Sequence, residues 1–203
     1  MVQEKKPEMV LVCGPNGAGK STLVYGVRKE DENTIPFIDP DRIAKEQQCS
    51  SIKAGEIAIA SVRKHIASKE SFIWESTLSS KFDFQMINEA KEKGFMVTLH
   101  YVGLQTADSA VARVKERHAK GGHFVPEEDV RRRYKRSLEN LPRAIKLVDS
   151  AKITDNSGAD CRVVAAFEKG KPVPYDFMPG WFQKIFDKLR SQSQIDQKKG
   201  KEK

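Results

Sequence analysis

The stretch that decides the fold is MVLVCGPNGAGKSTLVYG, residues 9–26. Within it, GPNGAGKS at residues 14–21 is a complete GxxxxGK[ST] motif, preceded by a short apolar run and followed by a helix-forming sequence. The glycines allow the backbone to curl until successive N–H groups face an anion, at the positive N-terminal end of the next helix. The motif therefore predicts a P-loop that binds the phosphates of a nucleotide. A chance glycine-rich turn is the alternative, and the flanking strand and helix argue against it.

Two side chains of the loop have predicted parts in binding a nucleotide. Lys20 contributes a positive charge for the β and γ phosphates, and the Ser21 hydroxyl supplies one hard oxygen ligand for Mg²⁺. The residues expected to contact the nucleotide at this loop are Gly14, Pro15, Asn16, Gly17, Ala18, Gly19, Lys20, Ser21 and Thr22.

Signatures of three other P-loop classes are missing from the sequence. It contains no NKxD guanine motif, no run of four apolar residues that ends in Asp-Glu, and no LSGGQ-like motif. These gaps disfavour a GTPase, a hydrolytic motor ATPase and a transporter ATPase. ATP and Mg²⁺ are therefore the expected cofactors of a kinase.

Strand-like and helix-like segments alternate along the chain, as in a parallel sheet wrapped by helices. The fold class we expect is α/β, a P-loop NTPase fold with a mostly parallel central sheet and an Arg-rich helical lid. We expect strands at 9–14, 34–39, 71–76, 95–104 and 151–156, and an edge strand at 161–170 whose direction stays open. We expect helices at 19–29, 40–48, 53–68, 80–93, 107–119, 126–148 and 181–190. The β-branched and aromatic run 95–104 predicts the most central strand.

The length of 203 residues suits one compact domain, which we expect over residues 1–190. The tail 191–203 is basic and has almost nothing apolar to bury, so it is expected to be disordered. No apolar run could cross a bilayer and no signal peptide is evident, which indicates a cytoplasmic protein without membrane contact. Three cysteines and four histidines are scattered without the spacing of a disulfide framework or a zinc site.

Two carboxylates follow the second expected strand, in the stretch IDPDRI at residues 38–43. They fall at the carboxyl edge of the sheet, where ligands bind in open α/β folds. Asp41 is the better candidate for a general base that accepts the proton of a hydroxyl acceptor. Asp39 is expected to bind substrate, and capping the helix that starts at Pro40 is an equal alternative.

The third expected strand ends at the same edge with Glu75, Ser76 and Thr77, which we expect to bind the acceptor. The competing interpretation is that they cap the following helix. Trp74, just before them, is interpreted as a core residue rather than a ligand platform.

The formal net charge of +8 is concentrated in one internal segment. Residues 113–146 carry eleven Lys and Arg against five acids, which is +6, and the tail supplies the remaining +2. Arg113 and Arg117 share one helix face, a Gly-Gly pair follows, and a second helix carries an Arg-rich run. This pattern predicts a mobile lid over about 113–146 whose arginines neutralise the triphosphate, with Arg117 and Arg133 as candidates for catalysis. The alternative is a solvated basic helix.

In combination, these stretches resemble the zeta toxin family of P-loop kinases. The resemblance runs through GPNGAGKS (14–21), IDPDRIA (38–44), WESTLSS (74–80), GGHFVPEEDVRRRYKRSL (121–138) and ITDNS (153–157). It implies a kinase that phosphorylates the amino sugar of UDP-N-acetylglucosamine and is held inactive by an antitoxin protein. Larger members hold the sugar nucleotide and the antitoxin with additional segments that this compact chain lacks, so the acceptor stays open.

The resemblance also implies roles for individual residues. Asp41 matches the family's base and Glu75 its acceptor-site glutamate. The lid arginines fall in the regions of Arg117 and of 131–133. The adenine pocket corresponds to Asn156 and Ser157, with Arg113 stacked on the adenine by similarity to adenylate-kinase-like lids.

Two other functions compete with a small-molecule kinase. One is a nucleic acid end kinase or nucleic-acid-binding protein that uses the basic segment, against which no aromatic platform is interleaved with that segment. The other is a regulatory protein that binds ATP and a partner without turnover.

Overall fold

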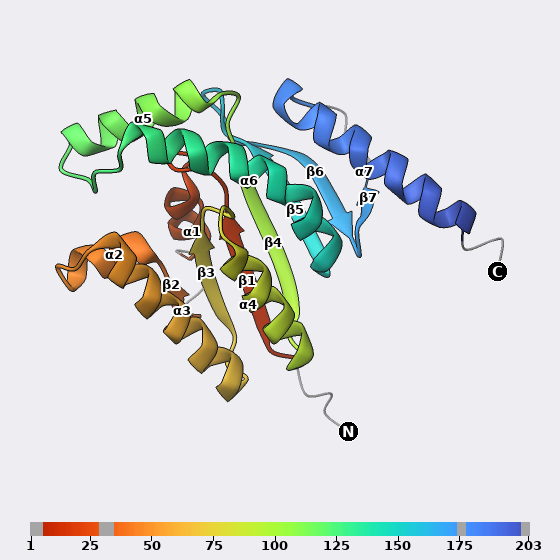
Figure 1. Cartoon of the computed structure of the whole chain (residues 1–203), viewed down its shortest axis with the longest axis horizontal. Coiled ribbons are helices and arrows are strands. Elements are labelled where there is room, and N and C mark those ends of the chain that lie inside the picture. The colour runs from red at the N-terminus through yellow and green to blue at the C-terminus, as the bar shows by residue number, and fades with distance from the viewer. Residues whose placement is uncertain (1–5, 29–34, 174–177, 200–203) are drawn as a thin grey trace.

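The computed structural model describes residues 6–28, 35–173 and 178–199. The described residues form one seven-stranded sheet in the order β2-β3-β1-β4-β5-β6-β7, which crosses the molecule in Figure 1. The strands are β1 (Glu8–Cys13), β2 (Phe37–Ile38), β3 (Phe72–Ser76), β4 (Met96–Gly103), β5 (Ser150–Asp155), β6 (Arg162–Glu168) and β7 (Lys171–Val173). Strands β1 to β5 run parallel, and β6 and β7 are antiparallel. The mostly parallel sheet is confirmed, with β4 as its middle strand.

Helices cover the sheet and rise above its carboxyl edge (Figure 1). They are α1 (Lys20–Arg28), α2 (Pro40–Glu46), α3 (Ser51–Ser68), α4 (Lys81–Glu92), α5 (Ala107–Ala119), α6 (Glu127–Leu147) and α7 (Gly180–Lys199). The main core joins one face of the sheet to α3, α4, α6 and α7, and Leu11, Phe72, Leu99 and Phe182 are fully buried in it. Val12 points to the opposite face, where it packs with Val24 of α1.

Helix ends follow the local sequence. Asp39 caps α2 by accepting from the backbone N–H of Asp41 at 2.9 Å, and Pro40 takes the first helical position. Ser80 and Asp83 form a reciprocal capping box at the start of α4. Gly94, at φ +85°, follows the last turn of α4. These caps fix the two segments that border the site.

The C-terminal part of the chain differs from expectation. Helix α7 continues past Arg190 to Lys199, into the tail that was expected to be disordered. No Gly or Pro interrupts residues 191–199, and Gly200 is the first such residue, so the chain has no local reason to leave the helix earlier. Residues 200–203 lie outside the described residues, as do Lys29 and Thr34 at the ends of two expected elements. The short strand β7 was not predicted.

A search of the described helices finds none with the length and apolar character needed to span a membrane.

Candidate active site

The P-loop has backbone angles that favour glycine. Gly14, Gly17 and Gly19 have φ values of +140°, +76° and +89°. A Cβ on Gly14 would lie 2.0 Å from the carbonyl oxygen of Val102, because β1 and β4 are adjacent. The loop therefore needs glycine at Gly14 both for its conformation and for space.

Lys20 and Ser21 meet Glu75 at the start of α1. The buried Nζ of Lys20 donates to the carbonyl oxygen of Pro15 at 3.1 Å and lies 3.6 Å from a carboxylate oxygen of Glu75. The Ser21 hydroxyl donates to the other oxygen of Glu75 at 2.8 Å. Ser21 and Glu75, which are 54 positions apart in the sequence, thus belong to one polar cluster. They meet because β3, which contains Glu75, pairs in parallel with β1, which leads into the P-loop.

This cluster fits a magnesium ion. Hydroxyl and carboxylate oxygens are the ligands that Mg²⁺ prefers, and Ser21 and Glu75 present one of each side by side. Among the residues that the structure describes, no group of three or more His, Cys, Asp or Glu is arranged to hold a metal. A sparse protein ligand set suits Mg²⁺, which keeps several waters and takes further oxygens from nucleotide phosphates.

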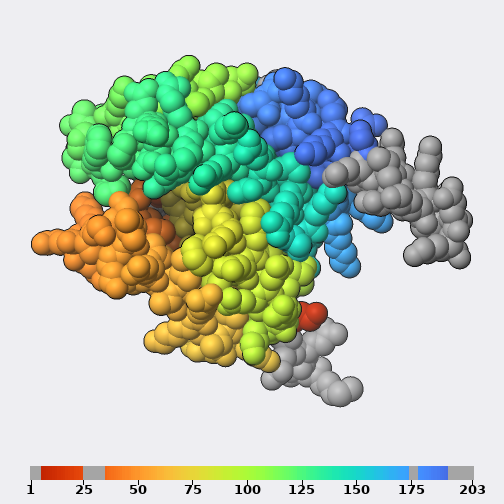
Figure 2. Space-filling view, in the orientation of Figure 1, coloured from red at the N-terminus to blue at the C-terminus, as the bar shows by residue number. Residues whose placement is uncertain are grey.

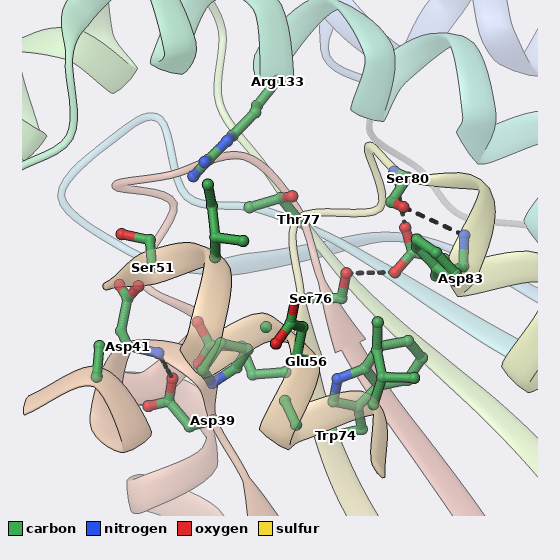
Figure 3. A pocket seen from close by; sticks show the side chains of 18 of the residues that line it. Asp39, Asp41, Ser51, Glu56, Trp74, Ser76, Thr77, Ser80, Asp83 and Arg133 are labelled. Carbon is green, nitrogen blue, oxygen red and sulfur yellow. Dashed lines mark hydrogen bonds between the residues drawn. The ribbon is translucent and has the colours of Figure 1, made fainter. Parts of the chain in front are cut away.

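A cavity of about 550 Å³ opens beside the P-loop. Its walls come from the P-loop, α2, α3, the end of β3, the start of α4, and α6 (Figure 3). Figure 2 shows the recess between the orange surface of α2 and α3 and the green surface of α5 and α6. The predicted site residues that line it are Asn16, Lys20, Asp39, Asp41, Glu75, Ser76, Thr77 and Arg133.

The two aspartates after β2 have different surroundings. Asp39 is 5% exposed and accepts the N-cap hydrogen bond described above. Burial, and then the nearby charge of Glu75, raise the pKa of Asp39 to about 6. Asp41 is half-exposed and pairs with Arg117, whose Nη1 lies 3.3 Å from its carboxylate. Asp39 thus caps the helix and also lines the cavity, and its binding of substrate stays a prediction.

The hydroxyls after β3 are engaged in local bonds. Ser76 donates to Asp83 of α4 and accepts from the N–H of Leu78, and Thr77 bonds to the hydroxyl of Ser79 at 2.7 Å. Burial raises the pKa of Asp83 to about 6, although hydrogen bonds from Ser76 and the backbone act against it. Asp83 was missed from the sequence; the Ser-x-x-Asp spacing of the capping box was the available signal.

Two buried polar atoms of cavity-lining residues have no hydrogen-bond partner in the part of the chain that the structure describes. They are Oδ1 of Asn16, in the P-loop, and Nε1 of Trp74, at the end of β3. The two side chains are only 5% and 4% exposed. Because an unpaired buried polar atom is costly, each is a candidate for a hydrogen bond with a bound ligand.

The arginines of α5 and α6 separate into two groups. Arg131 pairs with Asp108 and Glu127, and Arg132 pairs with Asp129, so both are held on the outer side of α6. Arg133 reaches down from α6 toward the cavity (Figure 3), and no ion pair is found for it within the described ranges. Arg117 is held by Asp41 and also donates to the carbonyl of His123 at 3.4 Å.

A second, more open hollow of about 430 Å³ lies at the turn between α5 and α6. Lys45, Arg113, Arg117 and Lys120 line it, with Glu116 as its one acid among the described residues. Arg113 packs against the P-loop, since a Cβ added to Gly17 would lie 3.2 Å from the Cβ of Arg113.

The end of β5 closes over the opposite side of the loop. Asn156 donates from Nδ2 to the carbonyl of Ala18 at 2.8 Å, and a Cβ on Gly19 would lie 2.6 Å from that nitrogen. Ser157 bonds to Asp155 rather than to the loop. The side chain of Thr22 is exposed on α1. Asn156 therefore contacts the predicted phosphate cradle directly, whereas Ser157 and Thr22 lie at its margin.

Comparison with known proteins shows which family the chain belongs to. The family model described as zeta toxin matches residues 1–161. The chain belongs to the zeta toxin family. An uncharacterized protein of Haemophilus influenzae is 37% identical over 135 residues, which is 62% of this chain and 91% of that protein.

Solved structures share the fold of this zeta toxin family member. The AvrRxo1-ORF1:-ORF2 complex with ATP gives a TM-score of 0.65 at 15% identity, covering 92% of this chain and 64% of that chain. The PezAT toxin-antitoxin system of Streptococcus pneumoniae gives 0.53 at 19% identity, covering 78% and 72%. The chain thus spans just under two thirds of the AvrRxo1 chain that it matches. Family and fold support a P-loop phosphotransferase.

Proposed function

We propose that this protein transfers the γ-phosphoryl group of ATP to a hydroxyl group of a small acceptor. One observation carries the proposal. A single cavity is lined on one side by Asn16 and Lys20 of the P-loop and on the other by the carboxylates of Asp39 and Asp41. An acceptor in this cavity would have its hydroxyl between a base and the outermost phosphate, as in-line transfer requires.

Asp41 is the proposed base. The acceptor oxygen forms a bond to the γ phosphorus, the bond from that phosphorus to the β–γ bridging oxygen breaks, ADP leaves, and Asp41 takes the hydroxyl proton. Arg117 orients Asp41 through their 3.3 Å contact. Asp39 binds the acceptor from deeper in the cavity.

Lys20 and Arg133 neutralise charge on the transferring group. Magnesium, held by Ser21 and Glu75, would supply further neutralisation of the phosphate oxygens. The backbone N–H groups of the loop bind the phosphates, and Asn156 keeps the loop in shape through Ala18. Arg113, Asn156 and Ser157 are the proposed neighbours of the adenine.

The reaction is tested by incubating the protein with γ-labelled ATP, Mg²⁺ and small-molecule acceptors, starting with UDP-N-acetylglucosamine because the family resemblance implies it. Labelled product should form with the wild type and be abolished by Asp41→Ala and by Lys20→Ala. An Asp41→Ala protein of unchanged rate would remove the proposed role of Asp41. Thermal protection by ATP without any phosphorylated acceptor would instead favour a regulatory protein without turnover.

An antitoxin partner stays a prediction for this chain. Its motivation is the family, together with the fold shared with PezAT, which is named as a toxin-antitoxin system. Growth arrest on expression of the wild type, but not of Asp41→Ala, would support it. Unimpaired growth of cells that contain the active kinase would contradict it.

A further inference from the structure

We infer that the acceptor is a polyhydroxylated compound without phosphate or carboxylate groups, such as a free sugar or an amino sugar. The inference rests on the proposed phosphotransfer and concerns only what the cavity admits. It departs from the nucleotide sugar that the family resemblance implies. The charges, the hydrogen-bonding groups and the apolar surface of the cavity each point to it.

The cavity is acidic. Its described lining carries five carboxylates and two cations, Lys20 and Arg133. Lys20 is held by the Pro15 carbonyl and by Glu75 at the nucleotide side. Arg133 enters from α6, above the P-loop (Figure 3). Both cations are therefore placed to serve the phosphates of ATP.

On the acceptor side, the described lining has no cation left to pair with an anionic acceptor. Two of its carboxylates have partners outside the lining, since Asp41 pairs with Arg117 and Glu56 with Lys53. Asp39 and Asp83 have no ion pair within the described part of the chain, and their raised pKa values reflect this uncompensated burial. A diphosphate or carboxylate on the acceptor would meet charge of its own sign here, next to the triphosphate of ATP.

The hydrogen-bonding groups favour a ligand rich in donors. Ionised carboxylates only accept hydrogen bonds, so hydroxyl and ammonium groups are their natural partners. Trp74, whose side chain lines the cavity, also has a buried Nε1–H donor without a hydrogen-bond partner among the described residues. A ligand hydroxyl can accept from Trp74 and donate to a carboxylate at once, which a purely anionic group cannot do.

Apolar surface completes the match. Ala44, Ala58, Ile59 and Trp74 lie among the polar groups of the lining. A sugar ring presents carbon-bound hydrogens on its faces and hydroxyls at its edge, and thus suits mixed walls of this kind. The basic hollow at the α5–α6 turn does not offer the acceptor an anion site. It shares no lining residue with the cavity, lies beyond the Asp41–Arg117 ion pair, and adjoins the P-loop through Arg113.

The charge of the acceptor can be tested without knowing its identity. A bacterial metabolite extract is divided by anion exchange at neutral pH into an unbound fraction of neutral and cationic compounds and a bound fraction of anions. Each fraction is incubated with the protein, γ-labelled ATP and Mg²⁺, with Asp41→Asn as the control. We expect a labelled product from the unbound fraction only.

Label that arises only in the bound fraction would overturn the inference and leave the kinase intact. No label in either fraction would overturn the proposed function itself. A matched series adds a second measurement: glucosamine, N-acetylglucosamine and UDP-N-acetylglucosamine share one ring type and differ in charge. A kcat/KM highest for the nucleotide sugar would also overturn the inference.

Trp74→Phe tests the unpaired donor, because it keeps an aromatic ring and removes the N–H. We expect the KM for the acceptor found above to rise roughly five- to tenfold, as for one lost hydrogen bond, with the KM for ATP unchanged. Trp181→Phe is the matched control, since its Nε1 already donates to Asp155 at 3.0 Å, away from the cavity. Equal acceptor KM values for Trp74→Phe and wild type would contradict the role of Trp74.

Discussion

Among single residues, Glu75 has the most connected position in the site. It is buried, pairs with Lys20, accepts from Ser21 and also lines the cavity beside the P-loop. The sequence predicted an acceptor-site residue at this position. Its contacts add the P-loop, so under the proposed function one carboxylate would link the two substrates.

Removing the charge of Glu75 should therefore affect turnover more than folding. Glu75→Gln keeps the volume and one acceptor oxygen for Ser21, but leaves Lys20 without its counter-charge and would weaken the proposed magnesium site. We expect kcat to fall roughly 10²-fold or more. Steady-state kinetics at saturating ATP measures this. Glu89→Gln, in an exposed pair with Arg63, is the control, and equal kcat values for the two variants would contradict the assignment.

The raised pKa of Asp39 predicts a pH-dependent stability. The folded state holds this proton more tightly than the unfolded chain, so the free energy of unfolding decreases as pH rises from about 4 to 6. Asn is an equally good N-cap and stays neutral. Asp39→Asn should therefore raise the free energy of unfolding by roughly 1–3 kcal/mol at pH 8 and far less at pH 4.

Urea unfolding at the two pH values measures the effect, with Asp149→Asn as a control of opposite sign. Burial would raise the pKa of Asp149, but the N–H of Val97 and the charge of Lys91 outweigh it and lower the pKa. Asp149 therefore stabilises the folded state above its unfolded pKa, and Asp149→Asn should lose stability at pH 8. A gain for Asp39→Asn that is equal at both pH values would contradict the titration of Asp39.

The sequence could predict parts of the site whose residues are close together along the chain, but not contacts between residues far apart along it. The P-loop was predictable in detail because its chemistry lies within eight consecutive positions. The pair Asp41–Arg117 joins residues 76 positions apart, and no local pattern encodes it. Trp74 was interpreted as core, which its burial bears out, but the lack of a partner for its N–H depends on the packing of its neighbours.

At the scale of elements, three consecutive arginines of α6 have different surroundings. A helix turns by about 100° per residue, so three adjacent side chains cannot share one face. Arg131 and Arg132 meet acids outside, while Arg133 enters the cavity. The sequence alone could not tell which of the three reaches the phosphates.

Arg133 is therefore the arginine of this run that we expect to matter for turnover. Arg133→Ala should lower kcat roughly 10²- to 10³-fold, as for loss of one preorganised charge, while Arg131→Ala should change it little. Both variants replace one arginine of α6 with alanine, at positions about half a helical turn apart. A larger loss for Arg131→Ala would contradict the role assigned to Arg133.

The contact between β1 and β4 makes Gly14 a test of the loop. Gly14→Ala would force a Cβ to within 2.0 Å of the Val102 carbonyl, so we expect a loss of stability above about 2 kcal/mol together with a loss of ATP binding. Gly55→Ala, in α3 with nothing within 4 Å of the new Cβ, should gain up to about 1 kcal/mol. Chemical denaturation of both variants checks the pair, and a stable Gly14→Ala protein would contradict the strain.

For the molecule as a whole, ion pairs within the basic segment reduce the positive charge that is available to bind nucleic acid. Several cations of the basic segment are held by acids of the same two helices: Lys115, Lys120, Arg131 and Arg132. We expect labelled single-stranded 20-mers of DNA and RNA to bind no tighter than roughly 10⁻⁴–10⁻⁶ M at physiological salt. Fluorescence anisotropy over a salt series measures this, and tight binding with a steep salt dependence would revive the end-kinase alternative.

The fold was predictable in its class and in most of its elements, because alternating strand and helix patterns are local. The order of strands was less accessible, since β1 pairs with β3 and β4, which arrive about 60 and 90 residues later. The extension of α7 through residues 191–199 was missed because low apolar content indicated disorder while the absence of helix breakers allowed a helix.

The bond from Asn156 to Ala18 spans 138 positions of the chain. During synthesis the loop therefore leaves the ribosome 138 residues before Asn156, the residue that braces it. A nascent chain would carry the signature of a nucleotide-binding protein well before it has the brace. We expect products that terminate before β5 to be inert.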